Sequence, residues 1–242
     1  CGRAGRPLDT SRILMKRAFL SLVLLLATAA LVHAQEVQRH GLVFEKWVRD
    51  TFFEGYKPAS YTQRWDIPAA ANRAHGGIPV NPKAVKHGTP VDLGDALRQY
   101  AIDEPFLLII GFWQQDGDMK RIVNIIAPEI SPALWRQLWG PVTTADLLKL
   151  DALIKDTGPS VEETRRRALK MKNSPPFSEA IIQVNPKIDS HGQRRLQCSL
   201  RFGDVFRHLA PGADPQPQAH PALFGVEYPG PIAFGPRALK QP

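Results

Sequence analysis

The feature that most constrains this chain is the continuous apolar run from Phe106 to Trp113, which reads Phe-Leu-Leu-Ile-Ile-Gly-Phe-Trp. Its length and its β-branched and aromatic side chains favour a strand. A strand that is apolar at every position, and not only at alternate positions, must be covered on both faces. The run therefore predicts the central strand of a sheet that other elements cover on both sides.

The segments around this run alternate between strand and helix patterns. Strand patterns occur at residues 61–67, 78–85, 122–127, 180–184 and 195–202. Helical spacing of apolar side chains or capping residues occurs at residues 41–53, 92–100, 131–139, 144–155 and 160–172. This order predicts an α/β or α+β fold, a single domain with a mixed central sheet flanked by helices.

The segment at 78–85 contains Pro79 and Pro82. Proline has no N–H group, so it cannot donate to the hydrogen bonds of a sheet. We therefore expect an edge strand, a bulged strand or an extended loop at this point.

The N-terminal residues have the pattern of a secretory signal. Met15 is followed by Lys16 and Arg17, then by the apolar stretch 18–31, and small side chains lead up to Ala34. We expect residues 1–34 to be an upstream extension plus a signal peptide from Met15 to Ala34, and the protein to be secreted or periplasmic. The alternative is a membrane anchor, for which the apolar stretch is short. After cleavage we expect no integral membrane span.

The remaining residues divide into a globular domain at 35–210 and a proline-rich C-terminal tail at 211–242, which we expect to be extended or partly disordered. Outside residues 1–34 the chain has 26 basic and 22 acidic side chains. This mild basic excess is compatible with binding an anionic polymer. Cys198 is the one cysteine left, so no intramolecular disulfide is possible, and its strand-like surroundings predict a buried, inert thiol.

Polar residues suited to holding a divalent cation lie near the predicted strands. Asp66 is close to the end of the 61–67 segment, and Lys83 lies on the next segment, where Asn81 shares its face. Glu45 lies on the first predicted helix. Mg²⁺ usually takes one or two protein carboxylates together with water and substrate oxygens. A metal held in this way acidifies a water molecule and stabilises the charge that develops when a phosphodiester is cleaved.

In order and spacing, these residues resemble the core of the PD-(D/E)XK nucleases, the restriction-endonuclease-like fold. In that family an acid on the first helix precedes a strand aspartate, and a strand with acid-x-lysine, a helix and another strand follow. The matching segments here are Glu45, Asp66, Asn81-Pro82-Lys83, the helix at 92–100 and the strand at 106–113. The resemblance covers about residues 40–127.

The resemblance implies a Mg²⁺-dependent phosphodiesterase that acts on nucleic acid. Its implied catalytic residues are Glu45, Asp66 and Lys83, and its implied metal ligands are Asp66 and Glu45. The residues implied to contact substrate are Asn81, Arg98 and Gln99.

The chain departs from the family pattern in ways that keep a second hypothesis open. Asn81 stands where the family has Asp or Glu, and Pro68 follows Asp66 where a proline usually precedes the aspartate. Simpler roles also exist, since Glu45 can pair with Arg49, Asp66 can cap a turn, and Lys83 can be a surface lysine. The alternative is a secreted, non-catalytic binding or envelope-associated protein on the same scaffold.

Overall fold

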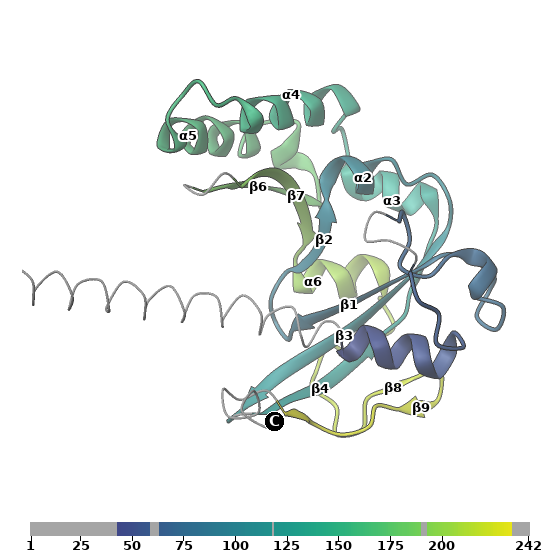
Figure 1. Ribbon diagram of the computed structural model, residues 1–242. Coiled ribbons are helices and arrows are strands. Elements are labelled where there is room, and N and C mark those ends of the chain that lie inside the picture. Colours follow the sequence, from purple (N-terminus) through teal and green to yellow (C-terminus); the bar gives the residue numbers. More distant parts are fainter. Residues whose placement is uncertain (1–42, 59–62, 118, 190–192, 234–242) are drawn as a thin grey trace, which may run out of the picture. The chain divides into compact units, whose positions relative to one another are not determined.

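The computed structural model describes residues 43–58, 63–117, 119–189 and 193–233 (Figure 1). The predicted upstream extension and signal peptide lie outside these residues. The described residues all belong to one structural unit, which begins at Val43. In this part of the chain, no helix has the length and apolar character needed to cross a bilayer.

The larger sheet is mixed and is built around the predicted central strand. Strand β3 (Phe106–Asp116) pairs in parallel with β1 (Val80–Lys86) and antiparallel with β4 (Met119–Ile126). Two short strands complete the sheet, β5 (Glu129–Ile130) against β3 and β10 (Ile232–Ala233) against β4. In the order β1-β3-β4-β10, β1 lies at an edge of the sheet, where Pro82 is tolerated. Of the three predicted alternatives, the edge strand is therefore the one that the structure has.

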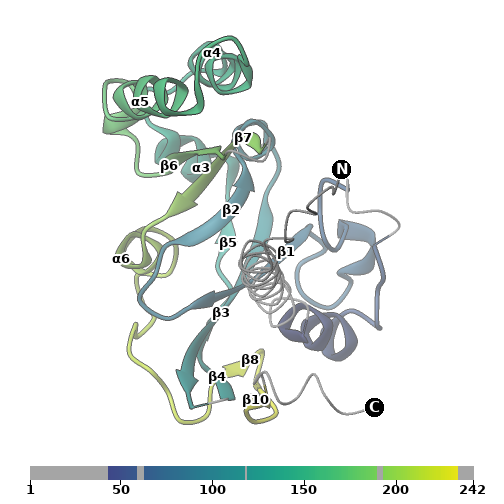
Figure 2. The same ribbon diagram turned by 60° about the vertical axis from the view of Figure 1, so that its left-hand side comes forward.

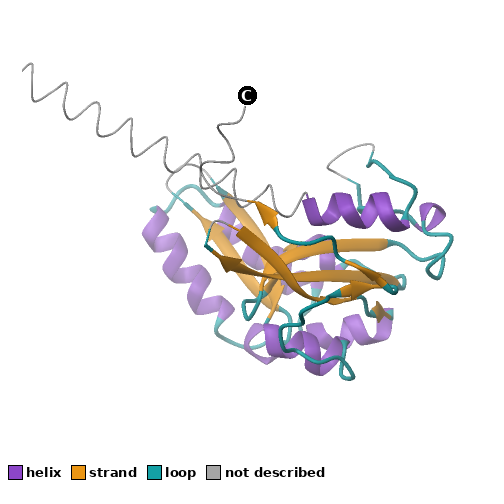
Figure 3. Cartoon of the chain, turned by 90° about the horizontal axis from the view of Figure 1, so that it is seen from below, coloured by secondary structure: helices purple, strands orange, loops and turns teal. Residues whose placement is uncertain are grey.

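Both faces of β3 are buried from Phe106 to Phe112, which explains the continuous apolar sequence there. Leu107 and Ile109 pack into one hydrophobic cluster, together with Phe44 of the helix of residues 43–52. Leu108 and Ile110 point the other way, into a second and larger cluster. Figure 3 shows the strands as a layer between helices, so the predicted mixed sheet flanked by helices is confirmed.

A second, antiparallel sheet contributes to the larger cluster. Its order is β2-β7-β6, with β2 (Val91–Asp95), β7 (Arg194–Leu200) and β6 (Gln183–Ile188). Helices α4 (Thr144–Lys155) and α5 (Val161–Lys172) lie against it (Figure 2), and α3 (Pro132–Trp139) leads into α4. The strand patterns predicted at 180–184 and 195–202 correspond to β6 and β7, which pair as an antiparallel hairpin, although β6 begins only at Gln183 and continues to Ile188. Cys198 of β7 is buried as predicted, and burial raises the pKa of its thiol well above the usual value.

The helices α3, α4 and α5 begin where the sequence predicts, and a side chain caps each of them. Ser131 Oγ accepts a hydrogen bond from Leu134 N at 3.2 Å, and Ser160 Oγ accepts one from Glu163 N at 3.2 Å. At α4, Thr143 and Asp146 form a reciprocal capping box. These ends are set by local side-chain contacts, which is why the sequence alone locates them.

The predicted strand at 61–67 is wrong for residues 63–66, which are not extended in a sheet, and residues 61–62 lie outside the described ranges. Ile67 alone pairs, through an isolated antiparallel bridge with Val80. Pro68 then lacks the N–H group that the ladder needs, and the chain turns into the 3-10 helix η1 (Ala69–Ala71).

The predicted helix at 92–100 is also wrong in its first half. Residues Val91–Asp95 form strand β2, and α2 spans only Ala96–Tyr100. Gly94 has φ +91°, a left-handed conformation that bulges β2 and prevents a helix from starting earlier. The N-cap is therefore Asp95, whose Oδ1 accepts from Arg98 N at 2.9 Å.

The proline-rich residues 211–233 run along the larger sheet. Asn124 Nδ2 of β4 donates to the carbonyl oxygens of Asp214 (2.8 Å) and Gln216 (3.0 Å). Tyr228 is buried, and the centroid of its ring lies 4.8 Å from that of Trp47. The ring of Phe224 stacks on that of His75. This segment holds the two-residue strands β8 (Ala222–Leu223), β9 (Val226–Glu227) and β10.

Candidate metal and substrate site

A pocket of about 200 Å³ lies between β1, β2 and α2. Five of the six predicted site residues line it, namely Asp66, Asn81, Lys83, Arg98 and Gln99. Arg64 and Asp95 also line the pocket, and neither was predicted as a site residue. Asp95 both caps α2 and lines the pocket.

The bridge between Ile67 and Val80 brings the acid and the lysine together. Because these two residues pair, Asp66 lies beside β1, and its Oδ2 is 3.9 Å from Lys83 Nζ. The Asp66 side chain is 41% exposed and that of Lys83 is 26% exposed, so both can reach a ligand. Asn81 lies two residues before Lys83 on β1 and shares its face, as predicted from the alternation of a strand.

Glu45 does not line the pocket, but it lies close enough to Asp66 and Lys83 to interact with their charges. The pKa of Glu45 is raised from 4.5 to about 7, chiefly by burial and then by the Asp66 carboxylate, whereas Lys83 and Arg49 oppose the rise. The ion pair expected from the helix spacing is present, with Arg49 NH1 3.8 Å from Glu45 Oε2. Glu45 is therefore partly protonated near neutral pH.

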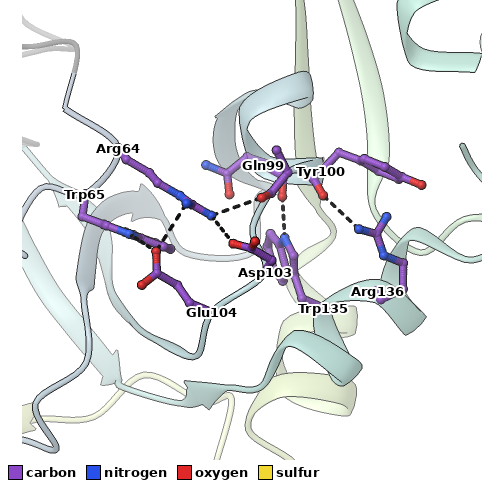
Figure 4. Close-up of polar contacts among 9 residues, drawn as sticks. Arg64, Trp65, Gln99, Tyr100, Asp103, Glu104, Trp135 and Arg136 are labelled. Carbon is purple, nitrogen blue, oxygen red and sulfur yellow. Dashed lines mark hydrogen bonds and ion pairs between the residues drawn. The ribbon is translucent and has the colours of Figure 1, made fainter. Parts of the chain in front are cut away.

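One wall of the pocket is fixed by a polar latch between distant segments. Arg64 NH2 donates to Asp103 Oδ1 at 2.7 Å and to Ala101 O at 3.1 Å, and Trp65 Nε1 donates to Glu104 Oε1 at 2.9 Å. Figure 4 shows Arg64 and Trp65 reaching together to Asp103 and Glu104 after α2. The hydrogen bond and the charge of Arg64 lower the pKa of Asp103. The latch holds the chain next to Asp66 against the α2 side of the pocket.

Arg98 and Gln99 lie on α2, and contacts with α3 fix the position of α2. Trp135 Nε1 of α3 donates to Gln99 O at 2.7 Å, and Arg136 lies over the ring of Tyr100 at 4.0 Å (Figure 4). Among the described residues, no carboxylate forms an ion pair with Arg98. Arg98 therefore lines the pocket, and no ion pair with a described residue neutralises its charge.

Comparison with protein-family models, curated proteins and solved structures gave no match. The resemblance to the PD-(D/E)XK nucleases therefore stays one of order and spacing. Any assignment of function must rest on the contacts and charges within the pocket.

The donors in the pocket fit Mg²⁺ better than they fit a metal that needs a full set of protein ligands. Within the described ranges, no three His, Cys, Asp or Glu side chains are grouped so that they could hold a metal. Asp66 supplies one carboxylate, and Mg²⁺ needs only one or two. Asn81 is 6% exposed, and its buried Oδ1 has no hydrogen-bond partner in the described structure. An unsatisfied buried oxygen costs about 1–3 kcal/mol, and an adjacent cation or water would satisfy it.

Proposed function

We propose that this protein is an exported, Mg²⁺-dependent phosphodiesterase with a restriction-endonuclease-like core, and that it acts on nucleic acid. The observation that carries this proposal is the 3.9 Å approach of Lys83 Nζ to Asp66 Oδ2, in a pocket that is also lined by Asn81, whose buried amide oxygen has no hydrogen-bond partner in the described structure. A carboxylate beside a cation is suited to metal-assisted cleavage of a phosphodiester, because the carboxylate can hold the metal and the cation can stabilise the charge of the substrate.

Each lining residue has a role that follows from its chemistry. Bound Mg²⁺ would supply an acidified water and charge stabilisation. Asp66 would hold the metal with Glu45 assisting, and the protonated carboxyl of Glu45 would ionise when a cation arrives. Lys83 would orient the water or stabilise developing negative charge.

Two residues of α2 complete the pocket on the substrate side. Arg98 presents a planar guanidinium, which binds a phosphate through paired hydrogen bonds. Gln99 and Asn81 offer amide groups that can donate to or accept from a nucleotide. These side chains give the pocket both the charge and the hydrogen-bonding groups that a phosphodiester needs.

A second candidate function is non-catalytic binding of a polar ligand by the same exported scaffold. It is favoured by Asn81, because an amide holds a cation more weakly than the carboxylate that stands there in the nuclease family. If Asp66 is the one carboxylate that holds the metal beside Lys83, the metal would be bound too weakly for turnover, and the pocket would then serve only to bind.

The decisive experiment is a calorimetric titration of the protein with Mg²⁺ and Mn²⁺, repeated on Asp66→Asn and on the control Asp116→Asn. Asp116 is an exposed carboxylate at the end of β3, outside the pocket. The same proteins are assayed for cleavage of single-stranded and double-stranded DNA and RNA. Metal binding and cleavage that are lost only in Asp66→Asn support the enzyme. Metal binding without cleavage of any substrate favours the binding protein, and no effect of Asp66→Asn contradicts the proposed site.

A further inference from the structure

A second pocket, of about 250 Å³, lies where the end of α5 meets β6 and the end of β7. Its polar lining consists of Lys172, Asn173, Ser178, Gln183 and Arg201. Two of these side chains are cations and none is acidic. No residue of this pocket is shared with the pocket around Asp66.

Neutral side chains fix the positions of both cations. Lys172 Nζ donates to Asn185 Oδ1 at 3.1 Å, and Asn185 Nδ2 donates in turn to Ser199 Oγ at 2.7 Å. With its amide oxygen turned toward the guanidinium, Gln183 accepts from Arg201 Nε at 3.2 Å and from Arg201 NH2 at 2.6 Å. These acceptors orient the two cations without neutralising them.

The charge on Lys172 is held at an electrostatic cost. Burial lowers the pKa of Lys172 below its usual 10.5, and the positive charge of Lys187 lowers it further. Among the described residues, neither Lys172 nor Arg201 forms an ion pair with a carboxylate. An anion between them would offset both the burial and the repulsion.

We propose that this pocket binds a phosphate group, either as the free anion or as part of a nucleic-acid backbone. A phosphate can accept hydrogen bonds from an ammonium and from a guanidinium at the same time, and both groups are held by hydrogen bonds here. Asn173 and Ser178 add an amide and a hydroxyl, which donate to the remaining oxygens. The absence of acid among the lining residues sets this pocket apart from the metal site, where Asp66 and Asp95 would repel a phosphate unless a metal were bound.

The test measures the affinity of the purified protein for inorganic phosphate and for a short single-stranded oligodeoxynucleotide, by calorimetry at low salt. Lys172→Gln and Arg201→Gln are compared with Lys170→Gln, which removes the same charge from α5 at an exposed position outside the pocket. We expect each pocket variant to weaken binding about ten-fold or more, which corresponds to about 1.4 kcal/mol. Lys170→Gln should leave the affinity within about two-fold, and circular dichroism checks that each variant is folded.

The outcomes separate the sources of the phosphate. Binding of the free anion alone identifies a small-molecule site, and binding of the oligonucleotide identifies a backbone contact. Absence of saturable binding of either probe, or equal loss in Lys170→Gln and the pocket variants, overturns the proposal. Arg201 is exposed, so Arg201→Gln keeps the test decisive even if Lys172→Gln fails to fold. Asp66→Asn should not weaken phosphate binding, so this site and the proposed metal site can fail independently.

Discussion

Asp66 and Lys83 lie within 3.9 Å of each other because a single antiparallel bridge, Ile67 to Val80, joins the chain before η1 to the edge strand β1. Both backbone hydrogen bonds of that bridge are present, at 3.1 Å and 2.8 Å. Pro68 ends the pairing directly after it. The acid is therefore placed by one fixed contact, and its carboxylate stays half-exposed over the pocket.

Replacing Lys83 by methionine should separate cleavage from metal binding. Removal of the cation should lower the cleavage rate by roughly 100-fold, as loss of one charge-stabilising donor does in other active sites. Metal affinity should be unchanged or higher, because the ammonium beside Asp66 repels a metal ion. Lys86→Met, an exposed position on the same strand, is the matched control. A parallel loss of metal binding in Lys83→Met would contradict the assigned role.

Replacing Asn81 by aspartate should strengthen metal binding. The side chain is 94% buried beside Asp66 and Lys83, so a carboxylate there would add a second charged ligand. We expect the affinity for Mn²⁺ to rise about ten-fold or more, and stability without metal to fall, because an unpaired carboxylate is buried. Calorimetry and urea unfolding with and without Mn²⁺ measure both effects. An affinity that falls or stays the same would place the metal away from Asn81.

The elements that sequence predicted well are those whose signals are local. The strand at Phe106–Trp113 is indicated by its own continuous apolar sequence. The helices α3, α4 and α5 and the strands of the β6–β7 hairpin are likewise indicated by residues within or next to them. The Asp66–Lys83 pair was predicted from the spacing of polar residues around two strands, although the strand expected before Asp66 is reduced to the single bridge at Ile67.

The parts that sequence reasoning missed depend on contacts between distant segments. Arg64 and Asp103 are 39 positions apart, so no periodic pattern indicates their latch. Strand β2 was predicted as the start of the helix at 92–100, but Gly94 adopts a left-handed conformation and β2 pairs with β7. The second sheet, and with it one wall of the pocket, follows from that pairing.

The stability of the protein should depend on pH through Glu45. Its pKa is about 7 in the folded protein and 4.5 ordinarily, so the protonated carboxyl favours folding. That contribution is fully present below pH 4.5 and is lost as the pH rises through about 7. Relative to Glu45→Gln, the wild type should lose on the order of 2–3 kcal/mol across this range. Urea unfolding at a series of pH values measures the difference, and Asp50→Asn on the same helix is the control. A difference that is constant with pH would contradict the raised pKa.

The close approach of β3 to the helix that carries Glu45 should make Gly111 hard to replace. A Cβ at Gly111 would lie 2.5–2.8 Å from ring atoms of Phe44, which is fully buried. The ring cannot move away without shifting the helix, because Phe44 also contacts Trp47 and Tyr228. We expect Gly111→Ala to destabilise the fold by about 1–3 kcal/mol, the usual cost of overpacking a core.

The same substitution should affect the proposed metal site, because Glu45 follows Phe44 directly on the displaced helix. Urea unfolding and Mn²⁺ titration of Gly111→Ala should therefore both change, whereas Gly203→Ala, where a Cβ meets no atom within 4 Å, should be close to neutral. In the double variant with Phe44→Leu, the smaller side chain makes room for the new methyl group, so the combined loss of stability should be less than the sum of the two single losses. Additive losses would mean that the contact between Gly111 and Phe44 does not set the position of the helix.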